Sequence, residues 1–167
     1  QLQAAGNFKE AETIYRKLLT IYPQHSGIMN LLGIACAALG NSKEGLVFFK
    51  NAIAIDPYYA DAYYNLGFTM QNLNELNSAL ANYEKAISIN PNYAEAYNNR
   101  GNVLRSLGQY DLASESYKKA TSIKPDYANA YLGIAILKLL LGQYEQGWQL
   151  YEWRWKSESL GVSKRNF

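Results

Sequence analysis

The chain contains little cysteine or histidine, and this scarcity limits the chemistry that it can perform. Cys36 is its single cysteine, which excludes an internal disulfide framework and favours a reducing, cytoplasmic compartment. His25 is its single histidine. The sequence also has no phosphate-cradling glycine loop and no paired carboxylates assignable to one cleft, so it offers no triad, acid–base pair or metal site. We therefore expect a non-catalytic chain that binds no cofactor and no metal.

Strong net charge and long apolar runs are missing too. Lysines and arginines number 16 against 14 acidic residues, and the resulting net charge of +2 is too mild for a dedicated nucleic-acid binder. The longest apolar stretch, residues 134–141, is interrupted by Lys138 and is far shorter than a membrane span. We expect neither nucleic-acid binding nor membrane insertion.

Proline is equally scarce, but its placement is regular. The only four prolines stand 34 residues apart, and other residue types keep the same interval: Pro23, Pro57, Pro91 and Pro125; Gly33, Gly67 and Gly101; Phe49, Tyr83, Tyr117 and Tyr151; Ala52, Ala86 and Ala120. A fixed interval of this length is typical of stacked helical repeats, which bury their core between neighbouring units. Such a chain presents a surface that holds a partner rather than a catalytic pocket.

Residues 94–127 show how one repeat is built. Tyr97, Gly101 and Leu104 recur at helical spacing in the first half, before Leu107-Gly108 signals a helix end. A second helix, starting near Tyr110, presents Ala113, Tyr117 and Ala120 on one face and ends before Pro125. The sequence predicts an antiparallel helix pair in which small residues allow a close crossing and a tyrosine fills the remaining space.

These residues resemble the tetratricopeptide repeat (TPR) family almost throughout the chain. The resemblance implies an all-α fold, a right-handed α-solenoid (superhelix) of helix-turn-helix units. We predict the second helix of a truncated unit at 1–25, three TPR units at 26–59, 60–93 and 94–127, a degenerate terminal unit at 128–161 and a tail at 162–167. Because residue 1 falls inside a repeat, we expect a fragment of a longer protein.

The last unit departs from the family pattern. Gly147 and Arg154 replace its two expected alanines, and its end carries all three tryptophans of the chain. One interpretation is a terminal unit that has no further TPR neighbour. In the other, Trp153 and Trp155 contact a following domain or a second subunit. The EWRW segment resembles the end of bacterial TPR arrays that precede glycosyltransferase-like domains.

The resemblance also implies where a partner binds, because TPR arrays usually hold extended peptides on the concave face formed by their first helices. We predict a peptide- or partner-binding set with two asparagines, Asn65 and Asn99, at the position of the asparagine ladder of O-linked N-acetylglucosamine transferases. The predicted set is Tyr64, Asn65, Phe68, Gln71, Asn98, Asn99, Asn102 and Arg105. The lysines of a chaperone-tail clamp are absent from the corresponding positions.

Both ends of this face are more apolar than its middle. Ile34, Ala37 and Ala38 lie at one end, and Leu132, Ile136, Leu139 and Leu140 at the other. Exposed apolar stripes imply an occupant. For the leucine-rich end we expect the tail from residue 156 onward, an appended domain or a second copy of the chain.

The function predicted from the sequence is a non-catalytic protein–protein interaction scaffold. Two alternatives remain open at this point: a substrate-recognition arm of a larger O-linked glycosyltransferase-like enzyme, and a self-assembling TPR oligomer. Concentration-dependent mass in solution distinguishes the second alternative from peptide binding.

Overall fold

The structure is a computed structural model that describes residues 7–156, where every regular element is a helix. The predicted all-α fold class is therefore confirmed. The chain divides into two compact units, residues 1–90 and residues 91–167. The predicted tail at 162–167 lies outside the described residues, as do 1–6 and 157–161. None of the described helices is both long and apolar enough to cross a membrane.

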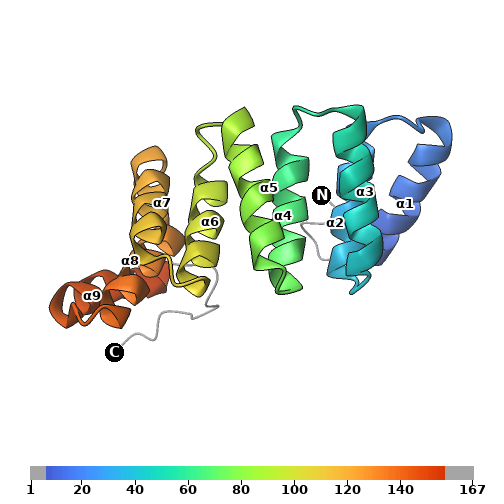
Figure 1. Cartoon of the computed structure of the whole chain (residues 1–167). Helices are drawn as coiled ribbons and strands as arrows, with labels where there is room; N and C mark the ends of the chain where they lie inside the picture. Colours follow the sequence, from blue (N-terminus) through green and yellow to red (C-terminus); the bar gives the residue numbers. More distant parts are fainter. Residues whose placement is uncertain (1–6, 157–167) are drawn as a thin grey trace. The chain divides into compact units, whose positions relative to one another are not determined.

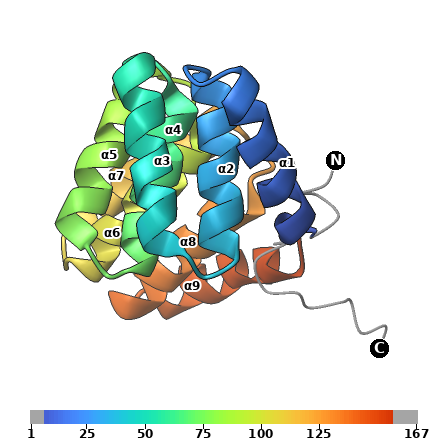
Figure 2. The same cartoon turned by 90° about the vertical axis from the view of Figure 1, so that its right-hand side faces the viewer.

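The first unit contains a single helix followed by two helical hairpins. Helix α1 packs against α2, α2 pairs with α3, and α4 pairs with α5 (Figure 1). Helix α4 also contacts α2 and α3, and Figure 2 shows α1, α2 and α3 as neighbouring ribbons. The bounds are α1 (Phe8–Ile21), α2 (Ser26–Ala38), α3 (Ser42–Ile55), α4 (Ala60–Asn72) and α5 (Leu76–Ile89).

The second unit contains one regular hairpin and one shortened hairpin. Helix α6 pairs with α7, and α8 pairs with α9 while also contacting α6 and α7. Helix α9 stops early, and the backbone continues as a 3-10 helix, η1, that also contacts α8. The bounds are α6 (Ala94–Ser106), α7 (Tyr110–Ile123), α8 (Ala128–Leu140), α9 (Tyr144–Tyr151) and η1 (Glu152–Lys156).

The turn inside each hairpin requires a left-handed backbone residue. Gly40, Gly108 and Gly142 take it with φ of 86°, 74° and 76°, which glycine adopts without steric cost. The hairpin α4–α5 has no glycine there, and Asn74 takes the same conformation with φ of 62°. Asparagine tolerates this region better than most residues because its short side chain can hydrogen-bond locally. The same turn therefore forms in the hairpin that has no glycine at this position.

The periodic aromatics and glycines pack against each other inside the hairpins. Phe49, Tyr83 and Tyr117 are fully buried. A Cβ atom on Gly101 would lie 2.7 Å from Tyr117 Cε1, and one on Gly67 would lie 3.1 Å from Tyr83. No larger residue fits at such a contact unless the ring moves. The predicted reason for the small residues, a close helix crossing, is thus present in both units.

Candidate functional site

The first unit contains a pocket of about 310 Å³ between its helices. Ile34, Ala37 and Ala38 of α2 line one side, and Tyr64, Asn65 and Phe68 of α4 line the other. The remaining lining residues are Phe8 from α1, Ser42 and Phe49 from α3, and Thr69 and Asn72 from α4. The structure thus brings three residues of the predicted binding set together with the apolar α2 stripe.

Two aromatic rings of α4 stand at this pocket. Tyr64 and Phe68 are stacked, with ring centroids 6.4 Å apart and an interplanar angle of 18°. Tyr64 also packs on Tyr83 of α5 at 5.9 Å, whereas the Phe68 side chain remains 46% exposed. Gln71, another member of the predicted set, does not line the pocket. Its Oε1 accepts a hydrogen bond from the Tyr83 hydroxyl at 2.8 Å.

An asparagine pair connects the two first helices of this unit. Asn65 Nδ2 of α4 donates to Asn30 Oδ1 of α2 at 3.0 Å, and Asn30 Nδ2 donates to the Tyr59 hydroxyl at 3.4 Å. Asn30 is buried and Asn65 is half-buried. Burial also raises the pKa of the Tyr59 hydroxyl. Asn65 Oδ1 has no partner among the described residues, so it can accept a hydrogen bond from a ligand.

The second unit does not repeat this pairing. Asn98, which is equivalent to Asn30, is only 4% exposed, although it belongs to the predicted partner-binding set. Its Nδ2 donates to Asn99 Oδ1 at 3.1 Å, but its own Oδ1 is buried without a partner in the described part of the chain. The position equivalent to Asn65 is Gly133, which has no side chain to donate. The missing donor explains the unpaired oxygen of Asn98.

A polar cluster joins α6 to α7. The Tyr117 hydroxyl donates to Asn102 Oδ1 at 2.8 Å, and Arg105 Nε donates to the same hydroxyl at 3.4 Å. Burial raises the pKa of Tyr117, and the bond from Arg105 opposes that shift. Asn102 and Arg105 are half-buried, and Asn102 Nδ2 has no partner among the described residues. This cluster therefore offers donors to a ligand.

The leucine-rich end of the second unit is only partly exposed. Leu132 is buried, Ile136 and Leu139 are half-buried, and Leu140 is 54% exposed. Leu139 packs where Gly147 of α9 leaves room. Three other large hydrophobic residues of this unit are also exposed and were not predicted as contact residues: Leu141, Tyr144 and Trp148.

The two tryptophans predicted to contact another domain have partners inside their own unit. Trp153 stacks on Tyr131 of α8, with centroids 4.2 Å apart and an interplanar angle of 15°. Trp155 Nε1 donates to Glu152 at 3.1 Å, and the Arg154 guanidinium lies 4.4 Å from the Trp155 ring centroid. Arg154 also lowers the pKa of the Glu152 carboxylate through a hydrogen bond. The stack of Trp153 on Tyr131 packs η1 against α8, whereas the other contacts lie within η1.

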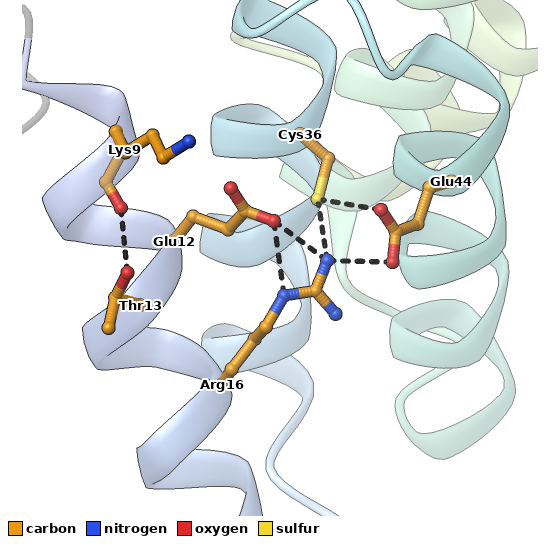
Figure 3. Close-up of polar contacts among 6 residues, drawn as sticks. All are labelled: Lys9, Glu12, Thr13, Arg16, Cys36 and Glu44. Carbon is orange, nitrogen blue, oxygen red and sulfur yellow. Dashed lines mark hydrogen bonds and ion pairs between the residues drawn. The ribbon is translucent and has the colours of Figure 1, made fainter.

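Charged residues gather around Cys36 in the first unit (Figure 3). Arg16 of α1 bonds Glu12 at 2.8 Å and Glu44 of α3 at 2.7 Å, while Cys36 Sγ lies 3.9 Å from the guanidinium (Figure 3). Ligand atoms of Glu12, Cys36 and Glu44 lie within 4.8 Å of one another, a spacing that could suit a metal ion. The arginine cation already occupies the space between the carboxylates, so the group is an ion-pair network that connects α1 to α3.

The pKa shifts of Arg16 and Cys36 agree with an ion-pair network rather than a metal site. The bonds from Glu44 and Glu12 raise the pKa of Arg16. Burial, followed by the neighbouring Glu44 charge, raises the pKa of the Cys36 thiol to about 11. A thiol with such a pKa stays protonated at neutral pH and is a poor nucleophile and a poor metal ligand.

Family models identify the repeats. A TPR repeat model matches residues 72–104 and 101–147, and two tetratricopeptide repeat models match residues 48–81 and 2–60. Together these matches extend from residue 2 to residue 147. The search of curated protein sequences found no match.

Solved structures of similar fold include TPR proteins. MamA is 28% identical with a TM-score of 0.79, and the alignment covers 96% of this chain and 94% of that one. A thermophilic TPR protein of Thermus thermophilus is 25% identical with a TM-score of 0.78, covering 95% and 87%. YrrB, described as a TPR protein with an unusual peptide-binding site, is 21% identical with a TM-score of 0.72, covering 93% and 80%. The last likeness concerns the fold alone.

Proposed function

Because the chain belongs to the tetratricopeptide repeat family, we propose that it is a non-catalytic scaffold that binds an extended peptide or a partner protein on its first helices. The observation that carries the proposal is the pocket of the first unit, where Tyr64, Asn65 and Phe68 face the apolar side chains of α2. An apolar cavity bordered by a few polar groups is the usual form of a binding site.

Polar groups on the first helices of each unit suit a peptide backbone. A backbone presents N–H donors and C=O acceptors at regular intervals, whatever its side chains are. In the first unit, Asn65 Oδ1 can accept a hydrogen bond from a backbone N–H. In the second unit, the Asn102 amide and the Arg105 guanidinium can donate hydrogen bonds to backbone C=O groups. Asn99 already accepts from Asn98, and Gln71 from Tyr83, so these members of the proposed set contribute fewer groups.

Peptides selected on the intact chain from a random-sequence display library would test this function. We expect selected peptides to bind with micromolar affinity, roughly −8 kcal/mol, in a fluorescence anisotropy titration. Phe68→Ala and Asn65→Ala test the first unit, and Asn102→Ala and Arg105→Ala test the second. Asn51→Ala on α3 and Lys118→Ala on α7 are matched controls, because both residues are exposed on second helices.

A loss of about tenfold or more, equal to about 1.4 kcal/mol, in the site variants of either unit supports the proposal. Circular dichroism must show that each variant retains its helices. If no peptide is selected, or if the control variants weaken binding as much as the site variants, the proposed function is wrong.

A further inference from the structure

We propose that the pocket of the first unit binds one aromatic side chain of the partner, so that an uncharged aromatic residue anchors the peptide. This inference rests on the proposed function and specifies the chemistry of the bound residue. Its first support is the lining. Rings from three helices border the pocket, Phe8 of α1, Phe49 of α3 and the stacked Tyr64 and Phe68 of α4.

The space itself comes from small residues. Ala37 and Ala38 of α2 lie in the wall where larger side chains would fill the cavity. A volume of about 310 Å³ is at the lower end of the range for ligand pockets, roughly 300–1,000 Å³. The pocket is therefore large enough for one bulky side chain and too small for several.

The absence of charge in the lining decides against a basic or acidic anchor. Among the described residues that line the pocket, none is an aspartate, glutamate, lysine, arginine or histidine. A charged side chain that entered the pocket would lose its hydration without finding an ion-pair partner, which is costly. The lining is thus complementary to an uncharged group.

Aromatic contacts favour a ring over an aliphatic side chain. Phe68 is 46% exposed although it lines the pocket, so much of its ring is left for a ligand to cover. Offset-stacked and edge-to-face ring pairs add binding beyond the area that they bury, about two- to tenfold in affinity. Asn65 Oδ1, in the same lining, can accept an N–H of the ligand, which favours a residue within a peptide over a free hydrocarbon.

The test uses the peptides selected on the intact chain, compared by anisotropy with synthetic variants. We expect an aromatic residue common to the selected peptides. Its replacement by alanine should weaken binding about thirtyfold or more, the usual effect at an interface hot spot. Replacement by leucine should cost about two- to tenfold, and replacement by lysine should cost at least as much as alanine. These measurements need no protein variant.

A protein variant then places the aromatic residue in this pocket. Ala38→Trp puts an indole at the pocket wall, and Ala54→Trp makes the same change at an exposed position of α3 outside it. In a double-mutant cycle, replacing the peptide's aromatic residue by alanine should hardly change the affinity for the Ala38→Trp chain, because the indole already blocks the pocket. The same replacement should weaken binding to the Ala54→Trp chain as much as binding to the native chain.

Peptides that bind and respond to Phe68→Ala, but share no aromatic residue or bind Ala38→Trp normally, overturn the aromatic anchor and leave the scaffold function standing. A chain that selects no peptide at all overturns both.

Discussion

Substituting leucine for Asn98 or Asn30 should change the stability of the two units in opposite directions. Both asparagines are 4% exposed and occupy equivalent positions on a first helix. They differ in their hydrogen bonds. Asn30 uses both its oxygen and its nitrogen, whereas Asn98 Oδ1 is buried without a partner among the described residues. Leucine has the same branching as asparagine but no polar side-chain atom. The same substitution at both positions therefore reports how the hydrogen bonding of Asn30 and Asn98 differs.

The magnitude follows from the hydrogen bonds. A buried polar atom without a partner costs about 1–3 kcal/mol, and a formed hydrogen bond contributes about 0.5–1.5 kcal/mol net. Asn98→Leu removes one unpaired oxygen and one bond to Asn99, so we expect a stabilisation of about 1 kcal/mol. Asn30→Leu removes two bonds and leaves Asn65 Nδ2 without its partner, so we expect a destabilisation of about 1–3 kcal/mol.

Native-state hydrogen exchange is the appropriate assay because repeat arrays can unfold in parts. Amides of α6 report on Asn98→Leu, and amides of α2 report on Asn30→Leu. Urea unfolding followed by circular dichroism gives the effect on the whole chain. The reasoning is refuted if Asn98→Leu accelerates exchange in α6 as much as Asn30→Leu does in α2, because Asn98 Oδ1 would then be satisfied in solution.

Three further perturbations test other contacts. Gly101→Ala should lower stability by about 1–3 kcal/mol, and more than Gly67→Ala in thermal melts, because its Cβ would lie 2.7 Å rather than 3.1 Å from a buried ring; equal losses would contradict the packing argument. The pKa of the Cys36 thiol is raised from 9.0 to about 11 in the folded chain. The protonated thiol therefore contributes fully to folding stability below pH 9, and this contribution is lost as the pH rises through 11. Cys36→Ala should accordingly lose less stability at alkaline pH than the native chain does. An unchanged pH profile would show that the thiol is not responsible. Arg16→Met should speed amide exchange in α1 by an amount equal to less than about 1 kcal/mol, because the ion pairs of Arg16 with Glu12 and Glu44 are exposed. The difference in exchange rate from the native chain should shrink in about 1 M salt. A difference that does not depend on salt would point to lost packing.

The helical architecture was predictable because it depends on residues that recur at a constant interval. Pro57 and Pro125 follow the second helices α3 and α7, and Gly108 closes the hairpin turn before α7. Each acts through local backbone geometry, which a sequence displays directly. The turn at Asn74 was not predicted, because asparagine adopts many other conformations and only the surrounding hairpin imposes a positive φ.

The binding surface was less predictable because it depends on contacts between repeats. Placement on a first helix assigned Tyr64, Phe68 and Ala38 to one face, but it did not show that Phe8 of α1 lines the same pocket as they do. Nor could spacing show that Trp153 stacks on Tyr131, because that contact requires η1 to fold back on α8. The burial of Asn98 was missed for the same reason, since it depends on neighbouring helices.

The unpaired oxygen of Asn98 is a consequence of how tightly Tyr117 is packed. A donor at position 133 could pair with it, as Asn65 pairs with Asn30 in the first unit. However, a Cβ on Gly133 would lie 2.5 Å from Tyr117 Cε1, and the same ring already packs against Gly101 on its own hairpin. Tyr117 cannot move aside freely, because it is fully buried and its hydroxyl is held by Asn102 and Arg105. Gly133→Asn should therefore destabilise the second unit rather than repair it, whereas Asn98→Leu removes the unpaired atom without disturbing the ring.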